Sequence, residues 1–168
     1  MIENLFSLKG RVALVTGGSR GIGKMIARGF VESGAKTYIS ARKADACDET
    51  AAELTALGHA QCISPPQDIS TVAGAKMLAE DIYKREGKLD ILVNNAGIIR
   101  PSKIEEGTLD DWRKTMAVNL DGVFLLSQAV GRQMIKQKSG NIITVGSMSG
   151  HIINWPFRHT AYNVSKAG

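Results

Sequence analysis

The feature that most constrains this chain is a regular alternation of short apolar runs with longer stretches of helical period. The runs have the length of strands, and the stretches between them are long enough to return over a sheet as helices. Parallel strands require such crossovers, and the crossovers place helices on both faces of the sheet. The sequence therefore predicts a doubly wound α/β fold with strand order 3-2-1-4-5. We expect strands at 12–16, 37–41, 60–64, 89–93 and 141–145, and helices from 22 to the stop at Gly34, at 45–57, 71–86 and 109–136, and from about 161.

Two of these segments carry a specific expectation about burial. In the first helix the apolar residues Ile22, Ile26 and Phe30 recur at a spacing of four, which is the period of one helix face. The run Asn141–Val145 lacks the alternation of a half-exposed strand and predicts a fully buried one.

Charge and composition exclude some classes of function. The chain has 168 residues, of which 43% are hydrophobic and 22% charged, as expected for one globular domain. Basic and acidic residues balance through Asp121, so the net charge of +5 comes from the five scattered basic residues that follow. No basic stripe with interleaved aromatic residues is present, and we expect no nucleic-acid partner.

The cysteines, histidines and apolar runs indicate the environment in which the protein is expected to work. Two cysteines, Cys47 and Cys62, form neither a disulfide framework nor a CxxC pair, so a reducing compartment is expected. No leader-like segment and no run near the ~18 apolar residues of a membrane span is found. We therefore expect a soluble cytoplasmic protein without a membrane partner. The three histidines lack partners at ligand spacing, and no metal is expected.

A glycine-rich segment, Thr16–Gly23, follows the first expected strand and opens the first helix. In a doubly wound sheet this is where phosphates bind, because the helix N-terminus offers N–H groups and a partial positive charge. Gly17 permits a sharp turn, Gly21 a close approach of a pyrophosphate, and Gly23 close packing of the helix on the strand. The segment predicts a dinucleotide site, although its spacing is GxxxGxG and not the generic GxGxxG.

That spacing, with the motifs that follow it, resembles the classical short-chain dehydrogenase/reductase family. The overall likeness is to members that reduce 3-oxoacyl thioesters with NADPH. The resemblance covers essentially the whole chain and rests on motifs in the family's order: TGGSRGIG at 16–23, Asp68-Ile69, NNAG at 94–97, Asn119, Ser147, and YNVSK at 162–166.

The resemblance implies a single NAD(P)-binding domain over residues 1–168, a three-layer α/β/α Rossmann fold. By the family pattern Asp68 holds the adenine, and Asn94 contacts the ribose region of the cofactor and braces the strands. The cofactor-binding residues so implied are Gly17, Ser19, Arg20, Gly21, Ile22, Gly23, Arg42, Asp68, Ile69, Asn94, Ala96, Gly97, Tyr162 and Lys166.

The residues at the end of the second strand indicate which cofactor is used. NAD enzymes typically place an acid there for the ribose 2′-hydroxyl, but this strand ends in Ile39-Ser40-Ala41-Arg42. Arg42, with Arg20 in the glycine loop, is able to form a cationic clamp for a 2′-phosphate, which arginine suits through charge-assisted hydrogen bonds. The sequence therefore favours NADP, bound as NADPH for reduction.

Tyr162 and Lys166 are four residues apart and share one face of a helix. A tyrosine hydroxyl has a pKa near about 10 in water, so proton transfer at neutral pH needs a neighbouring positive charge. The resemblance implies that Tyr162 transfers the proton and that Lys166 assists it and hydrogen-bonds the nicotinamide ribose. It also implies that Ser147 polarises the carbonyl and that Asn119 holds a water in the proton relay.

Two serines are candidates for the residue that polarises the carbonyl. The family's common spacing of 13 residues between serine and tyrosine selects Ser149, whereas the Ser-x-x-Gly position directly after the strand selects Ser147. We choose Ser147 and place a two-residue insertion in the following loop.

The loop 151–159 is expected beside the tyrosine. Its residues Trp155 and Phe157 either line a substrate pocket or pack the loop down, and Arg158, His159 or Arg100 offers a site for an anionic group. The leading prediction is a carbonyl reductase acting on a 3-oxoacyl thioester-like ketone or the matching secondary alcohol. The alternatives are a sugar-acid or polyol dehydrogenase, and a cofactor-binding module without catalysis.

The length of the chain bears on all of these functions. Family members usually continue for roughly another half-length, through two further strands and a substrate lid. We therefore expect these residues to be part of a longer polypeptide. The resemblance further implies a homodimer or homotetramer, with an oligomer face on the helix expected over 109–136.

Overall fold

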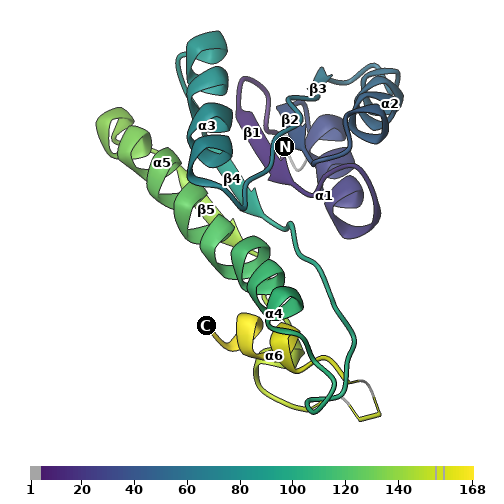
Figure 1. Ribbon diagram of the computed structural model, residues 1–168. Helices are drawn as coiled ribbons and strands as arrows, with labels where there is room; N and C mark the ends of the chain where they lie inside the picture. The colour runs from purple at the N-terminus through teal and green to yellow at the C-terminus, as the bar shows by residue number, and fades with distance from the viewer. Residues whose placement is uncertain (1–4, 154, 157) are drawn as a thin grey trace.

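The structure is a computed structural model and describes residues 5–153, 155–156 and 158–168 (Figure 1). Within these residues strands and helices alternate along the chain until the last strand. The order is β1 (Val12–Thr16), α1 (Gly21–Glu32), β2 (Lys36–Ser40), α2 (Ala44–Thr55), β3 (Cys62–Ile63), α3 (Val72–Glu86), β4 (Ile91–Asn94), α4 (Leu109–Met116), the π-helix η2 (Ala117–Asp121), α5 (Gly122–Gln137), β5 (Asn141–Thr144), the 3₁₀-helix η3 (Met148–Gly150) and α6 (Thr160–Ala167).

The sheet has the order β3-β2-β1-β4-β5, and every pairing in it is parallel. This confirms the predicted strand order. The order reverses at β1, which pairs with β2 on one side and with β4 on the other. Ligands bind outside the carboxyl ends of strands at such a reversal, so the loops after β1 and β4 are brought together there.

Helices cover both faces of the sheet, as predicted, and each layer has its own core. On one face α1 and α2 pack around Ala27, Val31 and Leu54; on the other α3 and α5 pack around Leu78 and Leu126. Figure 1 shows α1 and α2 on one side of the strands and α3 and α5 on the other.

The predicted helix at 109–136 is a single helical rod that α4, η2 and α5 share. Hydrogen bonding widens to the π pattern over Ala117–Asp121 and then returns to the α pattern. Single π turns inside α-helices are rare and are often found at functional sites. The site residue Asn119 lies in the middle of this one.

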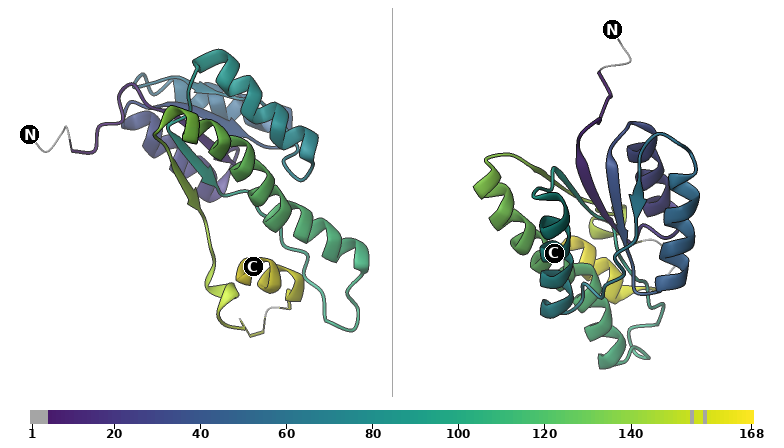
Figure 2. Two further views of the ribbon diagram at one scale, coloured as in Figure 1. Left: turned by 90° about the vertical axis from the view of Figure 1, so that its left-hand side faces the viewer. Right: turned by 90° about the horizontal axis from the view of Figure 1, so that it is seen from above.

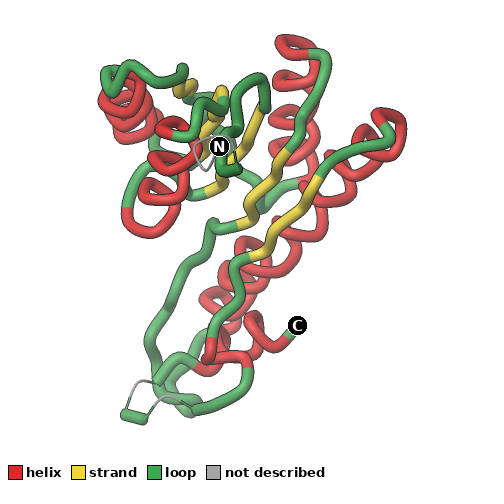
Figure 3. The backbone as a smooth tube through the Cα atoms, turned by 180° about the vertical axis from the view of Figure 1, so that it is seen from behind, coloured by secondary structure: helices red, strands yellow, loops and turns green. Residues whose placement is uncertain are grey.

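One expectation about burial was wrong, and a second was confirmed only in part. The run predicted as a fully buried strand forms β5, whose four residues are all exposed, because β5 is the outer strand among those described and pairs only with β4 (Figure 3). In α1, Ile26 and Phe30 are partly buried and pack against the core, beside the fully buried residues Gly23, Ala27 and Val31. Ile22 is 58% exposed because it faces a cavity instead of the core.

The last helix, α6, lies beyond the carboxyl end of β5, away from the sheet and against α4 (Figure 2). A bridge between Ser102 and His159 ties its N-terminal side to the long loop after β4. Nothing among the described helices is both long and apolar enough to span a bilayer. Cys47 and Cys62 are free and buried, and the compartment inferred from them remains a prediction.

Candidate active site

A cavity of about 580 Å³ opens at the carboxyl ends of β1, β2 and β4. The glycine loop forms one wall, the end of β2 and the start of α2 form a second, and the loop after β4 forms a third. Ten of the predicted cofactor residues line it: Gly17, Ser19, Arg20, Gly21, Ile22, Gly23, Arg42, Asp68, Ala96 and Gly97.

The glycine loop takes a shape that side chains would obstruct. Gly17 and Gly21 have φ of 67° and 56°, in the left-handed region that favours glycine. A Cβ atom on Gly23 would lie 2.5 Å from Nδ2 of Asn95 and still closer to the carbonyl oxygen of Gly17. The absence of a side chain at Gly23 therefore lets α1 start directly against the loop.

Thr16 fixes the loop after β4 to the end of β1. Its hydroxyl oxygen accepts hydrogen bonds of 3.0 Å from the backbone N–H groups of Asn95 and Ala96. Asn95 in turn donates from Nδ2 to the carbonyl oxygen of Thr16, at 2.9 Å. These bonds hold two walls of the cavity at a fixed separation.

Asn94 and Ile69 do not line this cavity. Both are buried, and Nδ2 of Asn94 donates to Oγ of Ser127 at 2.9 Å and to Oγ1 of Thr144 at 3.5 Å. Asn94 thus links β4 to α5 and β5, which is the bracing expected of it. Its contact with a ribose remains a prediction.

Sequence reasoning missed eight residues that line the cavity. For Lys43 a signal was available, because it follows Arg42 and lies at the same strand end. The others are small, apolar or amide side chains whose position depends on the folded loops. The eight are Ser40, Ala41, Lys43, Ala46, Gln67, Asn95, Ile98 and Val118.

Tyr162 and Lys166 come from α6. Nζ of Lys166 lies 5.8 Å from the centroid of the Tyr162 ring and donates a hydrogen bond of 2.8 Å to the carbonyl oxygen of Val145. Burial lowers the pKa of the Lys166 ammonium, because the charged form loses hydration. The His159 ring packs against the Tyr162 ring, with the two ring centroids 5.7 Å apart.

The two candidate serines differ in exposure. Ser147 caps η3, with Oγ accepting a hydrogen bond of 3.1 Å from the backbone N–H of Ser149, and it is partly exposed. Ser149 is only 5% exposed. A Cβ on Gly150 would collide with the backbone of Lys166, so the glycine of Ser-x-x-Gly lets η3 pack directly on α6. The choice of Ser147 over Ser149 remains a prediction.

The Asn119 side chain connects three elements. Its Nδ2 donates to the carbonyl oxygen of Ile98 and to Oγ of Ser165, each at 3.0 Å, and its Oδ1 accepts from the N–H of Ile98 at 2.8 Å. The helical rod, the loop after β4 and α6 are thereby tied together. Asn119 is 5% exposed, so this network lies beneath the surface.

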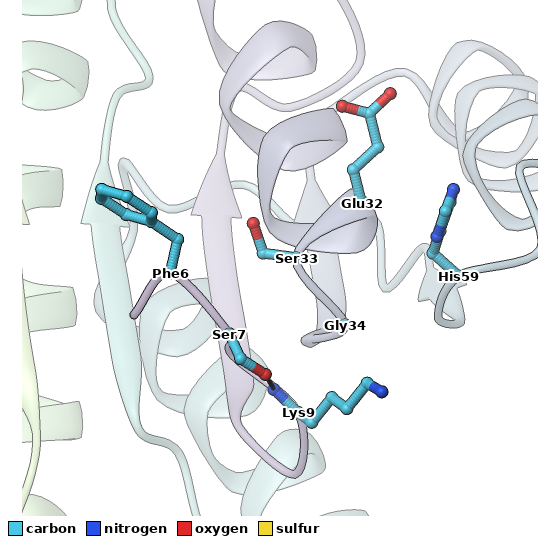
Figure 4. Close-up of a pocket in the computed structure, with 7 residues that line it drawn as sticks. All are labelled: Phe6, Ser7, Lys9, Glu32, Ser33, Gly34 and His59. Atoms are coloured by element: carbon cyan, nitrogen blue, oxygen red, sulfur yellow. Dashed lines mark hydrogen bonds between the residues drawn. The ribbon is translucent and has the colours of Figure 1, made fainter. Parts of the chain in front are cut away.

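Other cavities lie apart from these residues. One of about 330 Å³ is formed by exposed side chains at the opposite edge of the sheet, including Phe6, Lys9 and His59 (Figure 4). Another, of about 290 Å³, lies between the loop after β4 and the starts of α4 and α6. In the described part of the chain, no three histidine, cysteine, aspartate or glutamate residues are grouped as metal ligands. Phe157 lies outside the described residues.

The chain is similar to known proteins along nearly its whole length. The chain is 43% identical over 166 residues to the rhamnolipids biosynthesis 3-oxoacyl-[acyl-carrier-protein] reductase of Pseudomonas aeruginosa, covering 96% of the chain and 64% of that protein. It is 35% identical to the NADP-dependent mannitol dehydrogenase of Alternaria alternata, covering 99% and 64%. The RhlG/NADP active-site complex of Pseudomonas aeruginosa superposes with a TM-score of 0.87 at 42% identity, covering 96% and 64%.

The chain thus spans slightly less than two thirds of the length of these relatives. The model of the short chain dehydrogenase family matches residues 11–168, which include the glycine loop, the cavity and the Tyr162–Lys166 pair. The chain therefore belongs to the short chain dehydrogenase family.

Proposed function

We propose that this protein is an NADPH-dependent oxidoreductase that interconverts a ketone and a secondary alcohol. The observation that carries the proposal is the glycine-walled cavity at the carboxyl edge of the sheet, with Arg20 and Arg42 on its rim. The Tyr162–Lys166 pair lies beyond the same edge, on α6. The two NADP-related relatives support the choice of cofactor.

The residues of the cavity fit a dinucleotide phosphate. Gly21, which is exposed and has open space where a Cβ would stand, leaves the backbone accessible to a pyrophosphate at the start of α1, where the helix dipole favours an anion. The Asp68 carboxylate, whose position is set by two hydrogen bonds from Ser70, would accept a hydrogen bond from the amino group of adenine. Arg20 and Arg42 would bind the 2′-phosphate. When bound, the nicotinamide supplies or accepts the hydride.

The chain's own residues handle the proton and the carbonyl oxygen. In reduction Tyr162 donates its proton to the oxygen, and Ser147 donates a hydrogen bond to the same atom and so stabilises its developing negative charge. Lys166 stabilises the phenolate that is left, and because burial lowers its pKa it releases a proton more readily than a lysine in water. A water held beside Asn119 returns the proton from solvent.

We propose a 3-oxoacyl thioester-like substrate. The segment that follows Ser147 exposes four large apolar side chains, which suit an acyl chain better than a polyol: Met148, Ile152, Ile153 and Trp155. Asn163, next to Tyr162, donates from Nδ2 to the carbonyl oxygen of Ile152, at 3.4 Å, and so keeps this segment beside the reaction centre.

A polyol or sugar acid is the second candidate substrate, because one relative is a mannitol dehydrogenase and because Arg158 is exposed beside His159. A panel of 3-oxoacyl thioesters, keto-sugars and keto-acids, assayed by NADPH absorbance at 340 nm, separates the two. Higher kcat/KM on the thioesters supports the first, and turnover of the sugars alone overturns it. Tight NADPH binding without turnover of any compound would indicate a module without catalysis.

The cofactor is tested with Arg42→Asp. The acid removes a phosphate ligand and offers a partner to a ribose 2′-hydroxyl, so kcat/KM should fall for NADPH and rise for NADH. An unchanged preference, or wild-type protein that uses NADH as well as NADPH, contradicts the assignment.

We also propose that the protein forms homodimers or homotetramers through α4 and α5. This rod exposes Trp112, Phe124 and Ile135, which are 39%, 62% and 77% exposed. Light scattering after size-exclusion chromatography tests this, and a monomer at micromolar concentration refutes it.

A further inference from the structure

The rim of the cavity carries a third cation beside the two arginines. Lys43 follows Arg42, occupies the N-cap position of α2 and lines the same cavity as Arg20. All three side chains are exposed. We call Arg20, Arg42 and Lys43 the three-cation cluster.

The three-cation cluster is not neutralised within the described residues. None of its members has a carboxylate oxygen within 4.0 Å, although acidic residues are present in α2. The cations within α1 are paired: Lys24 with Glu53 at 2.5 Å and Arg28 with Glu32 at 2.8 Å. The unpaired cations of this layer thus gather at the cavity, where like charges repel one another unless an anion binds between them.

The spacing of the cluster is fixed by α2. Thr50, which is 4% exposed, donates from Oγ1 to the carbonyl oxygen of Ser19 at 2.9 Å. The residue after Ser19 is Arg20, so this bond holds one cation of the cluster relative to the other two, which precede α2. The Lys24–Glu53 ion pair adds a second tie between α1 and α2.

From these observations we propose that Lys43 is a specificity-determining residue that binds the 2′-phosphate of the cofactor as a third ligand, and that Thr50 is a positioning residue for Arg20. The proposal rests on the proposed use of NADPH and adds to it. A phosphate monoester carries nearly two negative charges at neutral pH and three acceptor oxygens. Three cations on separate backbone positions are therefore able to bind it from different sides.

The test measures binding, separately from turnover, on the intact protein. Dissociation constants for NADPH, NADH, 2′,5′-ADP and 5′-AMP are determined by calorimetry and nucleotide fluorescence for wild type, Lys43→Ala and Lys43→Arg. Lys84→Ala is the matched control, because Lys84 is an exposed lysine without an ion pair on α3, in the opposite layer. Thermal melts confirm that each variant is folded.

We expect Lys43→Ala to weaken the binding of NADPH and 2′,5′-ADP by about threefold to fivefold, the upper part of the range of one exposed charge contact. In Lys43→Ala the binding of NADH and 5′-AMP should change by less than about twofold. Lys43→Arg should bind NADPH and 2′,5′-ADP as tightly as wild type, and so should the control Lys84→Ala. The effect of Lys43→Ala should shrink as salt is raised, because salt screens exposed charges.

Thr50→Val keeps the shape of the side chain and removes the hydrogen bond to Ser19. It should reduce the NADPH-over-NADH binding ratio, and Thr50→Ser should restore it, whereas a purely structural role would lower both affinities together. The proposed role of Lys43 would be refuted if Lys43→Ala lost equal affinity for 2′,5′-ADP and 5′-AMP, or lost none. If wild type itself binds 5′-AMP as tightly as 2′,5′-ADP, the proposed cofactor is wrong, and the proposed role of Lys43 is wrong as well.

Discussion

Gly23→Ala gives a sharp test of the packing that builds the cavity. The new Cβ would lie 2.5 Å from Nδ2 of Asn95, and real Cβ contacts essentially never fall below 3.0 Å, so α1 and the loops must separate by at least about 0.5 Å. Such overpacking costs about 1–3 kcal/mol. The better helix propensity of alanine returns about 0.5–1 kcal/mol of that. A net loss of about 0.5–2 kcal/mol remains, which lowers Tm by roughly 1–8 °C for a chain of this size.

The control is Gly29→Ala on the same helix. Gly29 is exposed, and its Cβ would meet nothing within 4 Å, so this change should raise stability by about 0.5–1 kcal/mol. Thermal melts followed by circular dichroism, with and without NADPH, compare the two variants. Gly23→Ala should also weaken NADPH binding by about tenfold, because the displaced atoms of Gly17 and Asn95 form the cavity wall. If both variants melt alike and bind NADPH alike, the close packing of α1 against the loop is refuted.

Two further predictions concern acid stability and the choice of serine. Asp90 is buried, which raises its pKa, but the N–H of Val12 and the Lys88 and Arg11 cations outweigh burial and hold the pKa below its usual value. A carboxyl with a depressed pKa stabilises the fold above pH ~4 and loses this effect as the pH falls further. Asp90→Asn should therefore cost about 1–3 kcal/mol at pH 7, with a smaller deficit at pH 3 in urea unfolding; an equal deficit at both would contradict the assignment. Ser147→Ala should lower kcat by about 10²–10³-fold, and Ser149→Ala by less than about threefold; the reverse ranking would mean that the spacing of 13 identifies the serine.

The fold was predictable because the sequence repeats one local rule. Each buried parallel strand is a short apolar run, each crossover has helical period, and glycines close the helices at Gly34, Gly58 and Gly87, all of which have positive φ. The exposure of β5 was not predictable from its own residues. An apolar run specifies that a strand is suited to burial, but burial itself depends on which other elements lie against the strand.

The cavity was predictable where backbone geometry requires a particular residue. Glycines at 17, 21 and 23 and the cations at 20 and 42 belong to single loops whose position follows from the strand order. Ile22 shows the limit of the helical pattern, because an apolar residue next to a ligand site has the same period as one in the core. Gln67 and Val118 could not be found, since they reach the cavity only through the folding of separate loops.

Asn119 shows how the structure narrows a role that the sequence left general. Both hydrogens of its amide are donated to protein acceptors, and its oxygen already accepts from Ile98, so the side chain has no donor left for a water. A relay water beside it must therefore be held by an oxygen, either the remaining lone pair of the side chain or a backbone carbonyl. The observed role of the Asn119 side chain is to tie the π turn to α6 through Ser165, and its contact with a relay water remains a prediction.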